Sequence, residues 1–340
     1  MSVNDPLIRK TLPPGVCDLA VGEAHVVRSA LLETYDPEIF GSVGGVMDCD
    51  YQPPHGYQPL VDELERRTGK RCIVTAGAKQ GLSAVFYAMK RMGMIGVTMR
   101  GPWWSQMPAA IQMSGLDGFK PWDRPASLMG HLLVSPNNPD GHITNFVECA
   151  ILRSYCADKR VPLVHDAAYY SPVYVTTSDC SLPNLARTSI HSVSKAYGLS
   201  GLRVGWIATD DDVIYDHVCE YTEATTVGVA LPSQVLLYHI LREEAVHPQN
   251  HQRFIQHARR ELRTAKEMMV KVDQDVLETA GSVDVPGMFG WYKKGPRFDA
   301  ERAQIHVAPG SAFGDPSRVR INLAVGSNVL SKVVERLNSL

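Results

Sequence analysis

The stretch SVSKAYGLSGLRVGW, from Ser192 to Trp206, decides the fold of this chain. Lys195 follows a β-rich run and lies between small residues, and Arg203 follows eight residues later among glycines. A lysine at the end of a strand is ordinarily a solvated surface residue. A chemical role for Lys195 therefore depends on suitable partners elsewhere in the chain.

Strand-like and helix-like segments alternate around this stretch. Short β-rich runs predict strands at 72–75, 95–99, 132–135, 161–165, 188–193 and 206–209. Apolar residues at helical spacing predict helices at 23–34, 60–69, 80–92, 105–113 and 145–158. Such alternation indicates an α/β fold, with a mostly parallel sheet covered by helices in a large domain.

The pattern changes after about residue 233, where strands become short and sparse. We expect a long polar helix over 248–272, strands near 291 and at 319–323, and a final helix over 329–340. We therefore predict a large domain over 46–235 and a smaller α+β domain over 236–340, to which residues 1–45 contribute.

The composition narrows the class of protein. The 340 residues are 44% apolar and 21% charged, and the formal net charge of −2 gives no reason to expect a nucleic acid or a membrane surface as partner. No apolar run could span a membrane, and residues 1–10 lack the apolar core of a secretion signal. The seven cysteines are scattered, so we expect free thiols in a reducing cytoplasm and no metal site.

A lysine that forms a Schiff base with a phosphorylated pyridine cofactor needs an anion site, an acid near the ring nitrogen and a donor near the phenolic oxygen. The segment VTAGAKQGL, residues 74–82, offers the anion site, because a strand runs through Gly77 into a helix start. The alternative is an ordinary strand-to-helix turn. Ser192, Ser194 and Arg203 can add donors to an anion bound there.

The acid and the donor have candidates at other strand ends. Asp166, in VPLVHDAAYY, ends an apolar strand where ligands bind in α/β sheets, although it can also be a helix N-cap. Asn138, in SPNNPDG, is the candidate donor, and the segment also reads as a Pro-Asp-Gly turn. Tyr169 can reach the phenolic oxygen. Trp104 can stack on the ring, with Trp103 as its rival and core packing as the alternative for both.

In combination, these motifs resemble the fold-type I, class I/II aminotransferases that depend on pyridoxal 5'-phosphate (PLP). They are most similar to the alliinase and tryptophan aminotransferase branch. The blocks SPNNPDG, DAAYYSPVY and SVSKAYGLSGLRVGW carry the resemblance, which covers roughly residues 15–330. The resemblance implies the aspartate aminotransferase fold. It also implies that Lys195 is the Schiff-base lysine and proton shuttle, with Asp166 at the pyridine nitrogen and Tyr169 as a third catalytic residue.

The resemblance assigns the remaining contacts as well. Asn138 and Tyr169 touch the phenolic oxygen, and Trp104 stacks on the ring. The phosphate contacts fall on Gly77, Ala78, Lys79, Ser192 and Arg203. Arg320, in RVRINLAV, clamps the substrate α-carboxylate, with Arg318 as its alternative. Tyr51 reaches the phosphate of a neighbouring subunit, with Tyr57 as its alternative.

By the same resemblance, the activity is that of an aminotransferase working as a homodimer. Its substrates are an amino acid and a 2-oxo acid. No second arginine can be assigned to an acidic side chain, so we expect a neutral amino acid, hydrophobic or aromatic. The alternative is a PLP-dependent lyase, decarboxylase or cyclase. The cysteine-rich module that precedes the catalytic region of alliinase is absent from this sequence.

Overall fold

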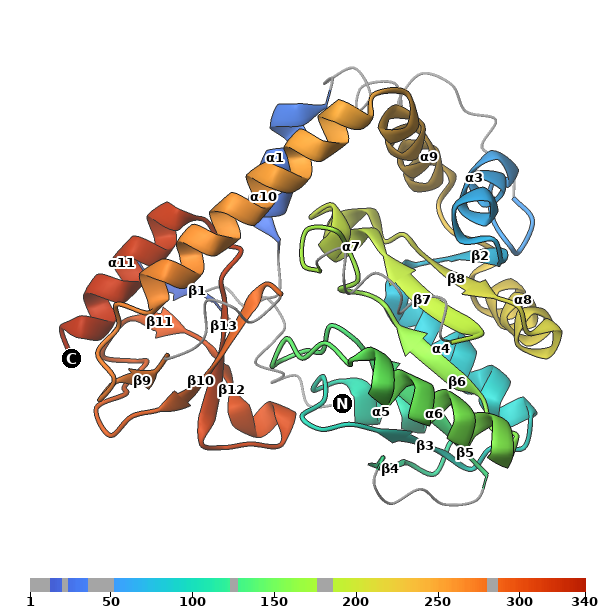
Figure 1. Cartoon of the computed structure of the whole chain (residues 1–340), viewed down its shortest axis with the longest axis horizontal. Coiled ribbons are helices and arrows are strands. Elements are labelled where there is room, and N and C mark those ends of the chain that lie inside the picture. The colour runs from blue at the N-terminus through green and yellow to red at the C-terminus, as the bar shows by residue number, and fades with distance from the viewer. Residues whose placement is uncertain (1–12, 20–23, 36–51, 123–127, 176–185, 280–286) are drawn as a thin grey trace.

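A computed structural model describes residues 13–19, 24–35, 52–122, 128–175, 186–279 and 287–340. In Figure 1 these residues form a sheet unit on the right and a C-terminal unit on the left, and the long helix α10 extends along the top and left. The sheet unit runs from α3 to α9. The C-terminal unit comprises α1, β1 and the elements from α10 to the end of the chain.

The sheet unit is built on a seven-stranded mixed sheet. The strand order is β2-β8-β7-β6-β5-β3-β4, and only β8 runs antiparallel to its neighbours. The strands are β2 (Arg71–Thr75), β3 (Gly96–Met99), β4 (Phe119–Pro121), β5 (Met129–Val134), β6 (Leu163–Asp166), β7 (Thr188–Ser192) and β8 (Gly205–Thr209). The mostly parallel α/β sheet predicted from the sequence is confirmed.

Helices cover both faces of this sheet. They are α3 (Gln58–Thr68), α4 (Gly77–Arg91), α5 (Met107–Met113), α6 (Phe146–Lys159), α7 (Val193–Ala196), α8 (Asp212–Thr226) and α9 (Leu231–Val246), with a short 3-10 helix at Ser200–Leu202. Local sequence fixes several of their ends. Asn145 caps α6, and its side chain and that of Glu148 exchange hydrogen bonds with each other's backbone N–H groups. Gly69 ends α3 with a φ of 68°.

The C-terminal unit joins the start and the end of the chain. The strands β9 (Leu277–Glu278), β10 (Phe289–Lys294), β12 (Ala308–Pro309) and β13 (Arg318–Asn322) form an antiparallel sheet, while β1 (Cys17–Asp18) pairs in parallel with β11 (Ile305–His306). The helices are α1 (His25–Thr34), α10 (Pro248–Met269) and α11 (Ser327–Asn338), with a 3-10 helix at Gly310–Phe313. α10 packs against both α1 and α11.

The predicted division near residue 235 stays a prediction. Residue 235 lies inside α9, which packs against α3 of the sheet unit, and the chain turns into α10 only after His247. A helix packed throughout on one unit favours a boundary at its end rather than at its middle.

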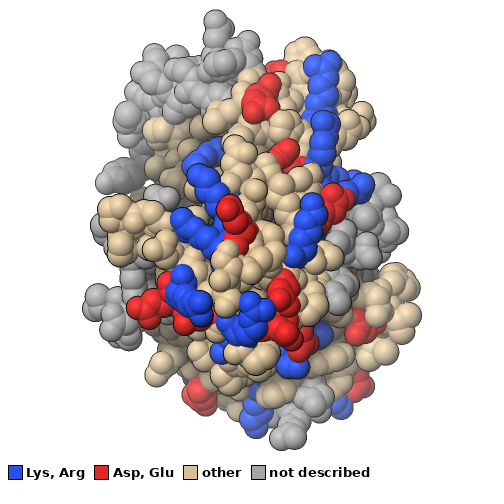
Figure 2. All heavy atoms as spheres, turned by 90° about the vertical axis from the view of Figure 1, so that its left-hand side faces the viewer, with Lys and Arg blue, Asp and Glu red and all other residues tan. Residues whose placement is uncertain are grey.

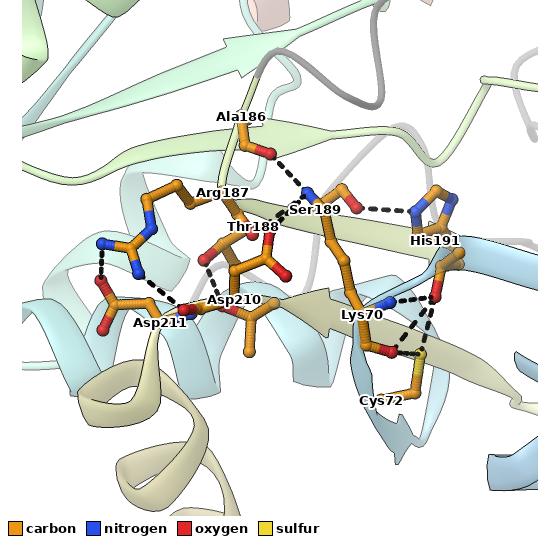
Figure 3. A network of polar contacts seen from close by, with 11 residues as sticks. Lys70, Cys72, Ala186, Arg187, Thr188, Ser189, His191, Asp210 and Asp211 are labelled. Atoms are coloured by element: carbon orange, nitrogen blue, oxygen red, sulfur yellow. Dashed lines mark hydrogen bonds and ion pairs between the residues drawn. The ribbon is translucent and has the colours of Figure 1, made fainter. Parts of the chain in front are cut away.

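Lys70 holds the amino edge of the large sheet, where β2 and β7 begin (Figure 3). Its ammonium donates to the Ala186 carbonyl at 2.7 Å and to the Arg187 carbonyl at 3.3 Å, and it lies 3.6 Å from the Asp210 carboxylate. The Lys70 side chain is only 10% exposed. Its charge is therefore satisfied by the strand ends that it joins.

The surface carries charges of both signs. Figure 2 views the molecule from the left-hand side of Figure 1, and basic and acidic side chains lie interspersed on that face. Ion pairs in the C-terminal unit include Arg297 with Asp273 and Lys293 with Glu278, each at 2.8 Å. Among the described residues, no helix is long and apolar enough to cross a membrane. The described part of the chain also holds no cluster of three or more side chains suited to a metal ion.

Candidate active site

A cavity of about 370 Å³ lies at the carboxyl edge of the large sheet. The parallel strands β5, β6 and β7 end there, and they deliver Asn138, Asp166 and Lys195. Ligands of open α/β sheets bind at this edge. Except for Gly77 and Tyr51, every residue predicted for the site lines the cavity: Ala78, Lys79, Trp104, Asn138, Asp166, Tyr169, Ser192, Lys195, Arg203 and Arg320.

Lys195 is carried on α7, a single helical turn directly after β7. The Ser192 hydroxyl caps this turn by accepting a hydrogen bond from the Ser194 N–H at 3.2 Å. The Tyr174 hydroxyl donates to the Lys195 carbonyl at 2.9 Å. The backbone is therefore held on both sides of Lys195, while its side chain lines the cavity.

Gly77 and Arg203 shape one end of the cavity. Gly77 begins α4 with a φ of +78°, and a Cβ there would lie 2.6 Å from Arg203 Nη2. Only glycine lets the arginine approach the turn so closely. Arg203 donates to the Ala76 carbonyl at 3.2 Å and to the Ser200 carbonyl at 2.9 Å. Ala78, next in α4, lines the cavity, so a helix start and a guanidinium meet in the arrangement that binds anions.

Gln106 is a cavity residue that the sequence analysis missed. It lies just before α5 and accepts a hydrogen bond from the Lys79 ammonium, which is also 5.5 Å from the centre of the Trp104 ring. Its one signal in the sequence is its place next to the tryptophan pair. Trp103 packs instead on Phe119, with ring centres 4.7 Å apart, so Trp104 is the tryptophan at the cavity.

Asp166 is the one carboxylate among the described residues that line the cavity. Burial raises its pKa to about 6, although the Ala168 N–H, which donates to Oδ1 at 3.1 Å, acts in the opposite direction. A turn, not a helix, follows Asp166, so the N-cap alternative is wrong. A cationic N–H group in the cavity would favour the ionised carboxylate and restore a lower pKa.

Asn138 links Tyr169 to Arg320. Its Nδ2 donates to the Tyr169 hydroxyl at 3.1 Å, and its Oδ1 accepts from Arg320 Nη1 at 2.9 Å. The predicted turn forms as well, since the Gly141 N–H donates to the Asn137 carbonyl at 3.0 Å. Burial raises the pKa of Tyr169 to about 12, although the charge of Arg320 opposes the shift. Because Arg320 lies on β13, both units contribute to the cavity.

The structure separates Arg320 from its rival Arg318. Arg320 is 2% exposed, and its guanidinium carbon lies 4.1 Å from the centre of the Phe289 ring. Arg318 pairs with Asp315 at 3.2 Å and is not among the described residues that line the cavity. Position therefore favours Arg320 as the carboxylate clamp, and the role itself stays a prediction.

The two tyrosines proposed for the neighbouring subunit cannot be compared in the same way, because Tyr51 lies outside the described residues. The Tyr57 N–H donates to Gln234 Oε1 at 2.7 Å, and its ring meets Tyr238 edge-on with centres 6.1 Å apart. In the described part of the chain Tyr57 packs beside α9 and away from the cavity lining.

Known proteins share this sequence and this architecture. Tryptophan aminotransferase-related protein 1 of rice (Oryza sativa subsp. japonica) is 28% identical over 217 residues, which is 60% of this chain and 46% of that protein. A probable aspartate/prephenate aminotransferase of Aquifex aeolicus (strain VF5) is 25% identical over 303 residues, 78% of this chain and 74% of that one. This chain thus spans less than half the length of the tryptophan aminotransferase-related proteins that it matches.

The solved structures agree on the fold. Aspartate aminotransferase from Thermotoga maritima superposes with a TM-score of 0.77 at 18% identity, over 95% of this chain and 91% of that chain. The aromatic aminotransferase of Pyrococcus horikoshii OT3 gives 0.74 at 16% identity, over 96% of each chain. The model of the allinase family (Alliinase_C) matches residues 70–282, more than half of the chain. This chain therefore belongs to the allinase family and has the fold of the PLP-dependent aspartate aminotransferases.

Proposed function

We propose that this chain is a PLP-dependent aminotransferase that moves the amino group of a neutral amino acid, hydrophobic or aromatic, to a 2-oxo acid. The observation that carries the proposal is that Lys195, Asp166 and Arg320, from three distant parts of the chain, line one cavity. The relatives named as aminotransferases support the same class of reaction. The family resemblance and the dispersed cysteines support a cytoplasmic homodimer as its working form.

The cavity residues fit PLP. The cofactor phosphate suits the end of the cavity where α4 begins beside Arg203, since glycine at position 77 leaves that turn open to a close approach. The pyridine nitrogen suits Asp166, a buried carboxyl whose raised pKa calls for a cationic partner. Lys195 lines the same cavity and is available to attach the aldehyde carbon.

When bound, PLP supplies an electron-withdrawing ring that stabilises a carbanion at the substrate's α-carbon. Asp166 keeps the ring nitrogen protonated. Asn138 and Tyr169 donate to the phenolic oxygen and hold the ring in one orientation. Lys195 Nζ holds the cofactor between turnovers and, once the substrate amine has displaced it, moves the α-proton.

The substrate end of the site is set by Arg320. Its planar guanidinium can bind an α-carboxylate through two parallel hydrogen bonds. The Asn138 oxygen holds one of its nitrogens at 2.9 Å, which orients the plane. Because the same amide also holds the Tyr169 hydroxyl, the carboxylate clamp and the phenolic-oxygen donors are fixed relative to each other.

Charge balance favours a neutral substrate side chain. Four cationic side chains and one carboxylate line the cavity, namely Lys79, Lys195, Arg203, Arg320 and Asp166, an excess of three positive charges. A phosphate monoester carries a charge of about −2 near neutral pH, and one α-carboxylate completes the balance. A second carboxylate on the substrate would leave the site with an unbalanced negative charge in a partly buried space.

A PLP-dependent lyase is the second candidate, and the match to the allinase family model is the observation that favours it. The cavity residues serve both reactions, because each begins with loss of the α-proton to Lys195. The two differ in where the proton goes next. A transaminase returns it to the cofactor carbon, whereas a lyase expels a group from the substrate's β-carbon.

A single-turnover experiment separates them. Loaded enzyme is mixed with leucine, phenylalanine or tryptophan, and with aspartate as the acidic comparison, without any amino acceptor. We expect stable build-up of the amino form of the cofactor with a neutral amino acid, reversed by adding a 2-oxo acid. Release of ammonia with return of the original visible band would contradict the proposal and establish the lyase. Preferential reaction with aspartate would overturn the substrate class.

A further inference from the structure

A buried hydrogen-bonded cluster lies directly behind the turn that carries Lys195. Tyr197, the residue that ends α7, donates from its hydroxyl to Glu244 Oε1 at 2.5 Å. Tyr197 is 8% exposed and Glu244 is 7% exposed. The Tyr197 N–H closes the α7 turn on the Val193 carbonyl at 3.0 Å. The bond to Glu244 therefore ties the cofactor-side turn to α9.

Glu244 is the centre of this cluster. Arg67 of α3 donates to its Oε2 at 2.7 Å, and His251 Nδ1 of α10 lies 3.1 Å from its Oε1. Although burial acts in the opposite direction, His251, Tyr197 and Arg67 together hold the pKa of Glu244 below its ordinary value. Burial and the charge of Glu244 hold the pKa of Tyr197 well above its ordinary value, so its hydroxyl remains a donor.

The cluster extends to the helices that join the two units. Tyr35, next to α1, places its hydroxyl 3.1 Å from His251 Nδ1. The Phe254 ring of α10 stacks on Tyr197 at 6.1 Å and meets Tyr35 edge-on at 6.4 Å. The turn itself touches α1, because a Cβ at Gly198 would lie 2.5 Å from the Ala24 carbonyl. Tyr197 and Tyr35 thus flank one phenyl ring, but only Tyr197 is attached to the Lys195 turn.

We propose that Tyr197 and Glu244 are positioning residues, which fix the α7 turn so that Lys195 meets the cofactor and the substrate in one orientation. The inference rests on the proposed function, since the group that Lys195 holds is the proposed PLP. A four-residue helix has too few hydrogen bonds to hold its own geometry. A buried polar pair of this kind is more useful for fixing one arrangement than for stability. Small misplacements of a catalytic group slow chemistry strongly.

Two matched substitutions test the proposal in the PLP-loaded enzyme. Tyr197→Phe removes the hydroxyl bonded to Glu244 and keeps the ring on Phe254. Tyr35→Phe removes a hydroxyl from the same cluster, beside the same ring, without touching the turn. The readouts are the rate at which borohydride reduces the lysine-bound cofactor, the pH midpoint of its visible band, kcat and the melting temperature.

We expect Tyr197→Phe to shift the pH midpoint and to change the reduction rate and kcat by about fivefold, the effect of one hydrogen bond. Tyr35→Phe should lower the melting temperature by a similar amount and leave the other three readouts at wild-type values. Equal behaviour of the two variants would show a merely structural role and overturn the inference.

Glu244→Gln decides the matter if Tyr197→Phe does not fold. The amide keeps an acceptor oxygen for Tyr197 and removes the charge, so we expect a smaller shift of the pH midpoint in the direction opposite to no change in Tyr35→Phe. An unshifted midpoint in Glu244→Gln would overturn the inference. A wild-type protein that shows no visible band with PLP would instead defeat the proposed function, which is a different failure.

Discussion

The two edges of the large sheet each carry a buried or half-buried lysine, and the two lysines have opposite surroundings. At the amino edge, Lys70 is surrounded by the carbonyls of Ala186 and Arg187 and by the Asp210 carboxylate (Figure 3). At the carboxyl edge, Lys195 lines a cavity of about 370 Å³ together with three other cations. One edge satisfies its charge within the protein, and the other presents charge to a cavity.

The difference shows what burial alone does not reveal. A lysine surrounded by backbone acceptors stabilises the chain that it joins, and its cost of burial is already offset. An excess of positive charge around a cavity is unfavourable until an anion enters it. We therefore expect substitutions at the amino edge to change stability and those at the carboxyl edge to change chemistry.

The largest effect should follow Lys195→Ala. Loss of both the covalent attachment and the proton transfer should lower kcat by roughly 10⁴-fold or more. Some PLP should remain bound, because the phosphate and ring contacts do not involve Lys195. Steady-state kinetics and the absorbance of the dialysed protein measure the two quantities. Turnover within tenfold of wild type would move the chemistry to another residue.

Asp166→Asn should be the next most damaging change. An amide cannot hold the pyridine nitrogen protonated, so kcat should fall roughly 10²-fold to 10³-fold. Asp140→Asn is the control, because Asp140 lies nearby in a turn, where it accepts from Asn137 Nδ2 at 2.7 Å. Equal, small losses in both variants would remove Asp166 from the mechanism.

The same carboxylate should make the cofactor-free protein less stable as pH rises. Burial raises the pKa of Asp166 from 3.8 to about 6 in the folded state. Between these values the folded protein binds more protons than the unfolded chain, so stability falls with increasing pH. The full effect amounts to about 3 kcal/mol.

Asp166→Asn removes this dependence. Relative to wild type, the cofactor-free variant should therefore gain stability between pH 4 and pH 7, as measured by urea unfolding. Addition of PLP should cancel the gain, because a cationic ring nitrogen favours the wild-type carboxylate. A stability difference that is the same at both pH values would contradict the buried, raised pKa.

Arg320→Lys should act on substrate binding. Lysine cannot form the flat two-point pair with a carboxylate, so KM for the amino acid should rise about tenfold. Arg318→Lys, at a residue already paired with Asp315, should change KM much less. The reverse ranking would transfer the clamp to Arg318, and no effect from either would argue for a substrate without a free α-carboxylate.

The smallest effect should follow Lys70→Ala at the amino edge. Removal of its hydrogen bonds to two strand ends should cost about 1 kcal/mol of stability. The kcat of the folded enzyme should stay at the wild-type value. A change in kcat comparable to that of the carboxyl-edge variants would break the contrast between the two edges.

Much of the sheet unit could be predicted from the sequence, because its strands are short apolar runs with helices of clear periodicity between them. The helices α8 and α9 were missed. The signal for α8 was present in Asp211, which caps it by accepting from the Val213 and Ile214 N–H groups. α9 has apolar residues on more than one side, so it shows no single apolar stripe.

The strand order and the smallest strands could not be predicted. β8 lies between β2 and β7, and that placement is set by packing between segments far apart in sequence. β1 and β11 are two residues each and pair across nearly the whole chain, which no local pattern encodes.

The site residues were found because each ends a strand or begins a helix. Gln106 was missed because its partner Lys79 is 27 positions away. The choice of Arg320 over Arg318 likewise needed the fold, since both lie on β13.

Borohydride reduction of the PLP-loaded protein, followed by peptide mapping, tests the central claim most directly. The account predicts that the reduced cofactor is attached to Lys195, in the peptide that contains SVSKAYGLSGLR. Attachment to Lys79, which lines the same cavity, would contradict the assignment of the catalytic lysine. Attachment to Lys70, at the opposite edge, would contradict the account of both edges.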